Sequence, residues 1–413
     1  MNQNKKGVLF LSYDGMTDPL GQSQVIPYLA GLSKAGYAIH LISFEKKERF
    51  TEGKAGIETL LNNANIVWHP AFYTKKPPVL STIKDVWTMK KMAGKVIRDN
   101  NIGLVHCRSA NTALVGLWAK ENFACRMIYD MRGFYADERV DGKIWNLKNP
   151  VFLAVFKFFK RKELEFIREA DYSVSLTENG KLEILSWESF KDKSPLIKVI
   201  PCCADLDHFS KDNYSQADVL LWRKKLGLQE EDFVLVYLGS LGTWYMVKEM
   251  LQYFSRLLLV KPAAKLLMIT TDDARLVKEH LASLSIPEKQ VVITAAKRNE
   301  VPALLSIADF SLFFILPVYS KKASSPTKLA ELMALSVPVV CNAGVGDVDR
   351  IVEQSHAGIV LHAFDNGSYD AAIQQMLNYR TDATKLREAA IEYASLETGV
   401  KRYREIYQLL LGY

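Results

Sequence analysis

The sequence predicts an α/β fold made of two doubly wound domains, each built on a parallel sheet. Segments typical of strands alternate with segments typical of helices along the whole chain, and this alternation favours parallel sheets covered by helices. The chain has 413 residues, which is too long for one ordinary domain and fits two domains of about 200 residues. Its strand-like segments are short apolar runs, such as residues 337–341, and such runs are typical of buried parallel strands.

The first domain is expected over residues 1–205. Its first strand is followed by a loop at residues 18–22 and a helix over residues 23–35, where apolar residues recur at helical spacing and Gly36 ends the pattern. A hinge that contains a proline is expected at residues 201–208. The strands of this domain are expected at residues 8–13, 38–44, 67–68, 104–107, 127–130, 172–176 and 199–200.

The second domain is expected over residues 206–395 and repeats the same arrangement. Helices are expected over residues 371–377 and 386–393. The tail at residues 399–411 carries apolar side chains along one helical face, which predicts an amphipathic helix. The strands of this domain are expected at residues 234–237, 266–269, 291–293, 311–315, 337–341 and 359–361.

The composition is that of a soluble globular protein, with 49% hydrophobic and 24% charged residues. The net charge of +7 is a small excess that suits anionic substrates or an acidic membrane surface, and its spread does not favour nucleic acid as a partner. The apolar runs are too short to span a bilayer. The N-terminal stretch lacks the small-residue cleavage site of a signal peptide, so it is expected to form a first strand.

The cysteines indicate a reducing compartment. Their number, five, is odd, and no CxxC pair occurs. This pattern does not support a disulfide framework or a zinc site. We therefore expect a cytoplasmic protein, with peripheral contact to the inner face of the membrane left open. The cysteines are Cys107, Cys125, Cys202, Cys203 and Cys341.

A stretch that begins at Ser324 has the features of an anion-binding helix start. A serine cap followed by Pro326 at the first helical position favours a helix that begins here. The backbone N–H groups of a first helical turn and its positive dipole end favour an anion such as a diphosphate, and Lys328 adds a charge beside them. Glu331, about one turn further on, offers a carboxylate to a ribose diol. The alternative is a solvated Lys/Glu pair on a helix surface.

Residues 326–347 resemble the signature of the retaining glycosyltransferases with the GT-B fold, of the family-4 (group 1) type. In that family a glutamate at the position of Glu331 is followed by a helix end and a Pro-Val-Val strand, here residues 338–340. A second acid normally lies eight positions earlier, where this chain has Ala323. The resemblance covers the whole chain and implies an N-terminal acceptor-side domain, a C-terminal nucleotide-sugar domain and a last helix, residues 396–413, that crosses back onto the first domain.

The resemblance also implies where the donor binds. Residues 19–22 resemble the family's glycine-rich loop, with a simple helix start as the alternative. Residues 297–300 resemble the loop that borders the base, with a solvated turn as the alternative. Ser240 stands where an arginine is common, and Lys248 takes the place of a lysine. The donor-binding residues implied in this way are Gly21, Gln22, Gly239, Ser240, Lys248, Arg298, Ser324, Ser325, Thr327, Lys328 and Glu331.

A second candidate site lies at residues 129–138, which follow a predicted strand and combine charged with aromatic side chains. The family often has a histidine near this strand end, where this chain has Asp130. Asp130 or Arg132 is therefore expected to face the reacting centre as the catalytic residue, with Asp137 and Glu138 on the acceptor side. The alternative is an internal Asp/Arg salt bridge.

Residues 148–168 join an apolar first half to a basic centre, with four basic residues between positions 157 and 162. Such a helix either packs into a core, which is the commoner outcome, or lies on an anionic membrane, where each basic residue adds about 1 kcal/mol. Membrane contact would suit a lipid-linked acceptor.

We expect a glycosyltransferase that moves a sugar from a nucleotide-sugar, its co-substrate, to the hydroxyl of a sugar or lipid-linked saccharide, without a further cofactor. The resemblance implies retention of configuration and a role in bacterial cell-surface polysaccharide or glycolipid synthesis, and the lack of a metal motif predicts metal independence. Asp272 and Asp273 lie at a strand end without the context of a metal motif. The alternatives are a nucleotide-sugar epimerase or hydrolase, and a nucleotide-sugar-binding protein without turnover, which the missing acid at Ala323 favours.

Overall fold

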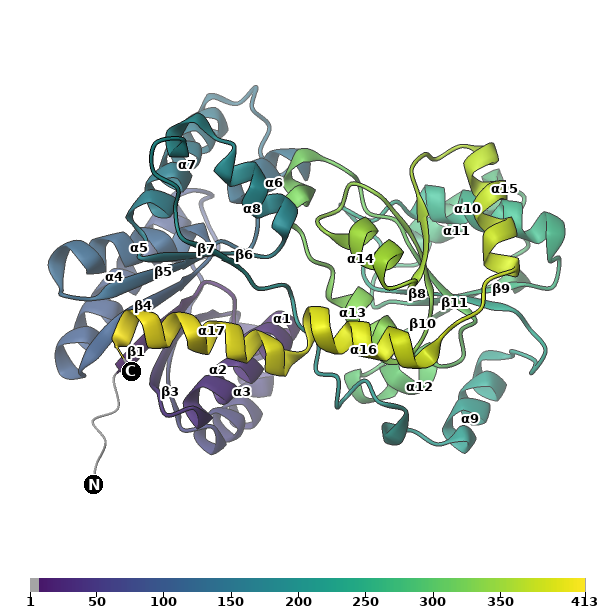
Figure 1. The fold of residues 1–413 in the computed structure, drawn as a ribbon, viewed down its shortest axis with the longest axis horizontal. Helices are drawn as coiled ribbons and strands as arrows, with labels where there is room; N and C mark the ends of the chain where they lie inside the picture. The colour runs from purple at the N-terminus through teal and green to yellow at the C-terminus, as the bar shows by residue number, and fades with distance from the viewer. Residues whose placement is uncertain (1–6, 413) are drawn as a thin grey trace. The chain divides into compact units, whose positions relative to one another are not determined.

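The structure is a computed structural model that describes residues 7–412. It divides into two compact units, one formed by Cys203–Ser395 and the other by the two segments that flank it (Figure 1). The first boundary thus lies between Cys202 and Cys203, whereas the sequence places it at 205/206. The predicted limits at residues 1 and 413 lie outside the described residues.

The sheet of the first unit is parallel throughout, and within residues 7–412 it has seven strands in the order β3-β2-β1-β4-β5-β6-β7. The chain starts in the middle of this sheet, builds outward to β3, and then returns to place β4 on the other side of β1. The order therefore reverses between β1 and β4. The strands are β1 (Gly7–Ser12), β2 (Ala38–Glu45), β3 (Ile66–Phe72), β4 (Ile102–Arg108), β5 (Arg126–Asp130), β6 (Tyr172–Ser175) and β7 (Ile197–Val199).

The helices of the first unit differ from the sequence prediction near residues 18–35. The predicted loop at residues 18–22 is wrong, because helix α1 begins at Pro19, and the predicted helix over 23–35 is broken at Val25. Pro27 lacks the backbone N–H that a continuous helix would need at this position, so a new helix starts beside it. The helices are α1 (Pro19–Gln24), α2 (Ile26–Lys34), α3 (Lys47–Asn63), α4 (Leu80–Asp99), α5 (Ala110–Asn122), α6 (Tyr135–Asp141), α7 (Pro150–Glu169) and α8 (Glu178–Leu185).

Helix α7 corresponds to the apolar and basic stretch at residues 148–168, and the structure divides it into two halves. Phe159, Phe166 and Ile167 in the second half are buried. The apolar first half, residues 150–156, contains no buried residue. Core packing therefore describes only the second half of this helix.

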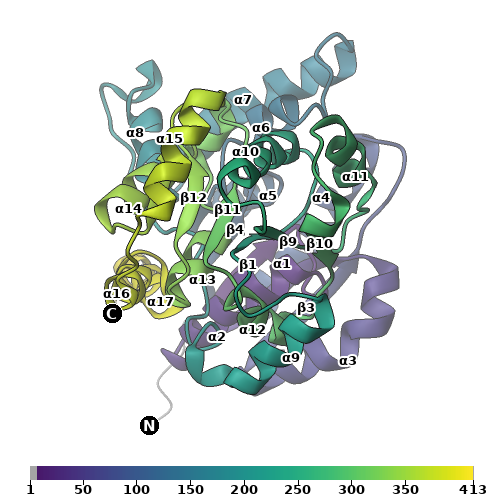
Figure 2. The same cartoon turned by 90° about the vertical axis from the view of Figure 1, so that its right-hand side faces the viewer.

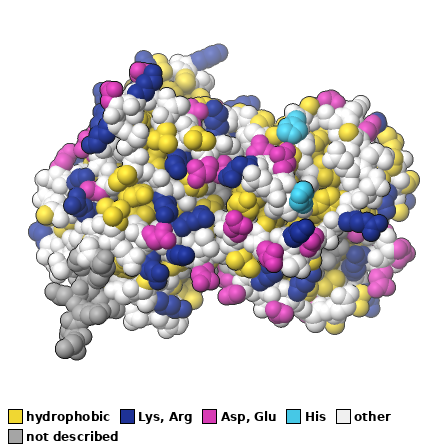
Figure 3. Space-filling model, viewed as in Figure 1, with side chains coloured by type: hydrophobic (Ala, Val, Ile, Leu, Met, Phe, Trp, Pro, Cys, Tyr) yellow, Lys and Arg dark blue, Asp and Glu magenta, His cyan; other side chains and the backbone are white. Residues whose placement is uncertain are grey.

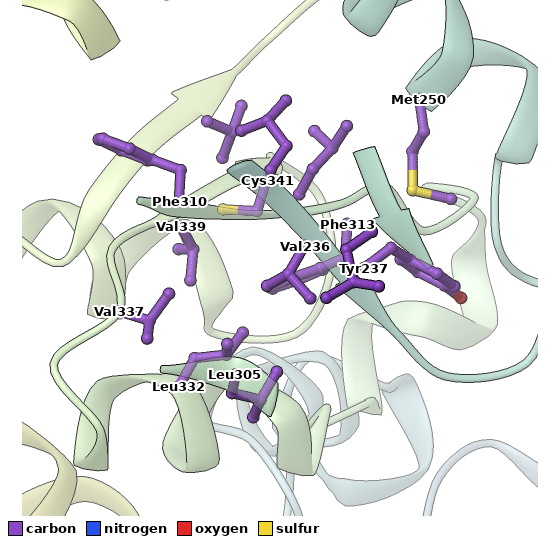
Figure 4. Packing of buried hydrophobic residues seen from close by; sticks show 14 of the residues in the cluster. Val236, Tyr237, Met250, Leu305, Phe310, Phe313, Leu332, Val337, Val339 and Cys341 are labelled. Atoms are coloured by element: carbon purple, nitrogen blue, oxygen red, sulfur yellow. The ribbon is translucent and has the colours of Figure 1, made fainter. Parts of the chain in front are cut away.

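The second unit repeats the doubly wound arrangement with a smaller parallel sheet. Within the described chain this sheet has six strands in the order β10-β9-β8-β11-β12-β13, so the order reverses between β8 and β11. Figure 4 shows Val236, Phe313 and Cys341 from three of these strands in one apolar cluster. The strands are β8 (Val234–Leu238), β9 (Lys265–Ile269), β10 (Val291–Thr294), β11 (Phe310–Phe313), β12 (Val339–Asn342) and β13 (Gly358–Leu361).

The helices of the second unit cover both faces of its sheet, as the turned view shows (Figure 2). Leu332 on α13 belongs to the core of this unit, together with Leu305 on α12 (Figure 4). The helices are α9 (Gln216–Leu226), α10 (Val247–Val260), α11 (Arg275–Ser283), α12 (Val301–Leu305), α13 (Thr327–Ala334), α14 (Val348–Gln354), α15 (Asn366–Leu377) and α16 (Ala383–Ala394). Within the described residues, one parallel sheet has seven strands and the other has six, and this confirms the predicted fold class.

The last helix, α17 (Leu396–Leu411), belongs to the first unit and packs on α2 and β4 (Figure 1). Its apolar stripe is buried at Tyr403, Ile406 and Tyr407. A Cβ atom at Gly31 of α2 would lie 2.6 Å from the side chain of Val400, so a glycine allows the two helices to approach. The Tyr403 hydroxyl donates a hydrogen bond of 2.9 Å to the carboxylate of Asp130, which fixes the helix to the end of β5.

We expect the change Tyr403→Phe to lower the free energy of unfolding of the first unit by about 1–3 kcal/mol, because it removes a donor from a buried carboxylate. Denaturant titration measures this loss. Tyr393→Phe is the matched control, since its hydroxyl makes an exposed hydrogen bond of 3.2 Å to Gln354 and should change stability little. Equal effects of the two changes would contradict the buried anchor.

Candidate functional site

The second unit has its candidate site where the strand order reverses. In doubly wound sheets ligands bind outside the carboxyl ends of the strands at such a point. Here the reversal lies between β8 and β11. The loop after β8 begins at Gly239, and the chain after β11 leads to the first turn of α13, which carries Lys328. These two segments contact each other.

Lys328 is buried although its ammonium group makes no hydrogen bond within residues 7–412. Its Nζ atom lies 3.9 Å from the ring centre of Tyr245, 4.7 Å from that of Tyr237 and 5.7 Å from that of Phe313. Ring faces attract a cation, which offsets part of the cost of burying it. Burial lowers the pKa of Lys328 to about 7, although the neighbouring Glu331 acts in the opposite direction.

Gly239 makes room for this ammonium group. Its φ angle is +141°, a conformation that side chains rarely adopt. A Cβ atom at this position would lie 2.7 Å from Lys328 Nζ. The loop is held by two further contacts: the Tyr237 hydroxyl donates to the carbonyl of Ser240, and the Leu241 N–H donates to the carboxylate of Asp272 over 2.7 Å.

Glu331 lies one turn beyond Lys328 on α13 and is partly exposed. Its low-dielectric surroundings raise the pKa of Glu331 to about 7, whereas the charges of Arg298 and Lys328 act to lower it. Arg298 is exposed and its guanidinium group lies 5.9 Å from the ring centre of Phe209. A cation, a carboxylate and a second cation therefore influence one another at this end of the sheet.

The start of α13 differs from the sequence expectation. Pro326 is the N-cap residue and not the first helical residue, and within the described chain no side chain accepts a hydrogen bond at this cap. Thr327 is the first residue of the helix, and Ser324 and Ser325 precede it as partly exposed residues. The N-terminus of a helix suits an anion, because its dipole end is positive and its first-turn N–H groups point outward.

The other predicted donor residues lie in two places. Ser240 and Lys248 are exposed on the loop after β8 and on α10, so they belong to the neighbourhood of Gly239. Gly21 and Gln22 lie in the first unit, inside α1. A Cβ atom at Gly21 would lie 2.2 Å from the Gly15 carbonyl oxygen, so this glycine is explained by a close backbone approach.

Asp130 and Arg132 are placed in the interior of the first unit and not at its surface. The side chain of Asp130 is 3% exposed and lies 3.6 Å from His106 and 3.8 Å from Arg132. Arg132 also donates to Cys202 Sγ over 3.0 Å. Burial alone would raise the pKa of Asp130, but Arg132 and His106 hold it below its ordinary value. The internal ion pair of the alternative is thus present, and the expectation that one of these side chains faces a reacting centre stays a prediction.

Asp137 and Glu138 lie in the first turn of α6. Asp137 pairs with Lys160 of α7 over 2.7 Å, and Lys160 also pairs with Glu163 over 2.8 Å. Burial raises the pKa of Glu163 to about 7. The spacing of residues in the sequence did not point to this cluster, because it joins α6 and α7 only in three dimensions.

Comparison with known structures identifies the fold as GT-B. The chain superposes on sucrose-phosphate synthase from Thermosynechococcus elongatus with a TM-score of 0.72 and 15% identity, covering 98% of this chain and 99% of that one. HepE from Anabaena in complex with UDP gives 0.68 and 15%, with 97% and 99% covered. WaaG, a glycosyltransferase involved in lipopolysaccharide biosynthesis, gives 0.65 and 14%, with 98% and 100% covered.

Sequence comparison relates one segment of the chain to a protein family. Residues 218–396 match the family model described as "Glycosyl transferases group 1". This segment covers most of the second unit, including Gly239, Lys328 and Glu331. The match covers less than half of the chain, so the second unit is similar to group 1 glycosyltransferases over this segment. Among curated proteins, no sequence matches the chain.

For the nucleoside-diphosphate site that the sequence predicts, tested with UDP as the probe, we expect Gly239→Ala to lower the affinity by about tenfold or more, since the added methyl group must displace Lys328 and the backbone becomes strained. Isothermal calorimetry measures the affinity. Gly242→Ala, in the same loop but facing open space, is the matched control and should leave the affinity unchanged. If the two variants bind UDP equally, Gly239 has no part in the site.

Lys328→Met should separate stability from binding. The change removes a buried cation and keeps an apolar chain among the rings, so the free energy of unfolding should stay the same or rise by up to about 4 kcal/mol. UDP affinity should fall about tenfold or more, because a charged donor is lost. Lys278→Met, on the exposed face of α11, should change neither quantity. A destabilised variant that still binds UDP would show that Lys328 is structural.

Proposed function

We propose that the protein transfers a sugar from a nucleoside-diphosphate sugar to an acceptor hydroxyl. The observation that carries this proposal is the buried ammonium group of Lys328, which sits among aromatic rings at a helix N-terminus without a hydrogen-bond partner in the described residues. A protein retains such a group when a ligand completes it, because an unpaired buried charge is costly. The group 1 family match of residues 218–396 supports the same conclusion.

In this proposal three residues of the second unit each contact a different part of the donor. Lys328 and the first-turn N–H groups of α13 bind the diphosphate. Glu331 accepts hydrogen bonds from the ribose diol, and Arg298 borders the base. HepE is known in complex with UDP and with UDP-glucose, so UDP is the first nucleotide to test.

The chemical step needs stabilisation of the departing diphosphate. Charge develops on its phosphate oxygens as the bond to the sugar breaks, and fixed donors aimed at that charge lower the barrier. Lys328 and the helix start are such donors. We propose transfer with retention of configuration, without a further cofactor and without a metal ion, since Asp272 already accepts from Leu241 and Asp273 pairs with Arg275 over 2.5 Å.

The proposed acceptor is a sugar or a lipid-linked saccharide held by the first unit, in the synthesis of a bacterial cell-surface polysaccharide or glycolipid. Lys157 and Arg161, the exposed basic residues in the centre of α7, support contact with an acidic membrane surface and a place at the inner face of that membrane. None of the helices within residues 7–412 combines the length and the apolar character needed to cross a bilayer.

A panel of nucleotides and labelled nucleotide-sugars tests the proposal. One of UDP, GDP, ADP and CDP should raise the melting temperature by several degrees at saturating concentration, because it binds only the folded chain. The matching nucleotide-sugar should then yield a labelled product only when a lipid extract or a saccharide is added. An isomer or free sugar would instead indicate an epimerase or hydrolase. Binding without any product would indicate a protein without turnover, as Ala323 suggests.

The affinity for the intact nucleotide-sugar should pass through a maximum near pH 7. Glu331 must be ionised to accept from the ribose, so affinity falls as pH drops below its raised pKa of about 7. Lys328 must be protonated to hold the diphosphate, so affinity also falls as pH rises above its lowered pKa of about 7. The limiting slope is about tenfold per pH unit on each side.

Calorimetry across pH 5–9, a range of about two units on either side of the expected maximum, measures this profile. Glu331→Gln should remove the acid limb and Lys328→Met the alkaline limb. A flat profile for the unmodified protein would contradict the assignment of both groups.

A further inference from the structure

The first unit contains a long groove that the donor site does not explain. It has a cavity volume of about 1020 Å³ and lies between α4, α5 and α7. Its walls are mainly apolar and aromatic, and residues from all three helices and from the loop before α7 contribute to them. Examples are Leu114, Leu117, Trp118, Trp145, Phe152 and Phe158.

Exposed apolar side chains lie on α4, which forms one wall of this groove. Leu80, Ile83 and Trp87 follow one another at helical spacing on α4 and are 57–62% exposed, and residues 150–156 of α7 are likewise not buried. Figure 3 shows hydrophobic side chains with lysines and arginines among them over the part of this unit where α7 lies. Contiguous exposed apolar surface of this kind marks a binding site for an apolar partner.

The inner end of the groove is polar and lies where the strand order of the first sheet reverses. Tyr13 follows β1, and Asn111 lies in the first turn of α5 directly after β4. Asn111 is 3% exposed, and its Oδ1 atom has no hydrogen-bond partner in the part of the chain that the structure describes. Its Nδ2 atom lies 3.4 Å from the Tyr135 hydroxyl. Because buried polar groups are normally hydrogen-bonded, an unpaired acceptor in a groove indicates a ligand that donates a hydrogen bond to it, for example from a hydroxyl group.

The charged groups along the groove favour an anionic head. Lys90 lies 5.9 Å from the ring centre of Trp118, and Arg139 lies 5.1 Å from that of Tyr135. Lys162 is neutralised by Glu165 over 2.7 Å. Glu121 is the other carboxylate in the wall. Two cations are thus held by rings close to the apolar wall, where an acidic group of a ligand reaches them.

We propose that this groove binds a lipid-linked acceptor, with an acyl or prenyl chain between α4 and α7 and a phosphate-linked sugar at Asn111 and Arg139, which both approach Tyr135. This rests on the proposed function and names the substrate class of its acceptor side. A peptide would bring backbone N–H and carbonyl groups against a wall with few polar partners, which is unfavourable. A hydrocarbon chain has no such groups, and each buried methylene adds affinity.

Binding of single-chain amphiphiles below their micelle concentration tests the inference. The probes are octyl, decyl and dodecyl phosphate, with dodecyl maltoside as a neutral head and inorganic phosphate as a head without a chain. Affinity should rise with chain length by up to about fourfold per methylene. It should be weaker for the maltoside and undetectable for inorganic phosphate. Trp118 and Trp145 line the groove, so tryptophan fluorescence reports occupancy beside calorimetry.

Two variants place a carboxylate in the wall. Ile83→Asp changes a side chain that is 59% exposed, so folding should be retained, and Phe152→Asp lies deeper. Each should lower dodecyl phosphate affinity about tenfold or more, because a charge enters an apolar wall. Leu221→Asp on α9, where the leucine is 64% exposed, should have no effect. Chain-length-independent binding, or equal binding by Ile83→Asp and Leu221→Asp, overturns the inference.

The failure of this inference is distinguishable from that of the proposed function. Lys328→Met should lower UDP affinity about tenfold or more and leave dodecyl phosphate binding unchanged. Ile83→Asp should do the reverse, and should lower transfer to a lipid extract while sparing UDP affinity. If the amphiphiles do not bind while UDP does and a soluble saccharide is glycosylated, the groove proposal falls and the glycosyltransferase stands.

Discussion

The conformation of the candidate site in the second unit depends on one buried lysine, Lys328, at the start of a helix. An ammonium group removed from water must be compensated, and here aromatic rings from β8, the following loop and β11 supply part of that compensation. The remaining cost is visible in the lowered pKa of Lys328. Gly239 is required because any larger residue would fill the space of the ammonium group. The sheet, the loop and α13 thus converge on a cation, and in the proposed function a diphosphate binds to it.

The same topological rule locates functional positions in both units. A doubly wound sheet reverses its strand order once, and the loops that follow the two strands at this point form a crevice at the carboxyl edge of the sheet. In the second unit the point lies between β8 and β11 and holds Lys328. In the first unit it lies between β1 and β4, where Asn111 ends an apolar groove. The two proposals therefore place an anionic nucleotide at one of these edges and an amphiphile with a polar head at the other.

Much of the fold can be predicted from the sequence, because each buried strand is a short apolar run and each run is local. All of the strands predicted within the described residues are found. The spacing of Lys328 and Glu331 likewise marks a local helix face. The aromatic rings around Lys328 could not be predicted, since Tyr237, Tyr245 and Phe313 come from separate segments that only the register of the sheet brings together. The burial of Asp130 escaped prediction for the same reason, because its partner Tyr403 lies in the last helix.

The most direct test of the central claim is a structure of the protein with UDP, or with whichever nucleoside diphosphate gives the largest thermal shift. The account predicts diphosphate oxygens within hydrogen-bonding distance, about 2.7–3.2 Å, of Lys328 Nζ and of the first N–H groups of α13, with the ribose at Glu331. A nucleotide bound elsewhere, with Lys328 still enclosed only by its rings, would contradict it.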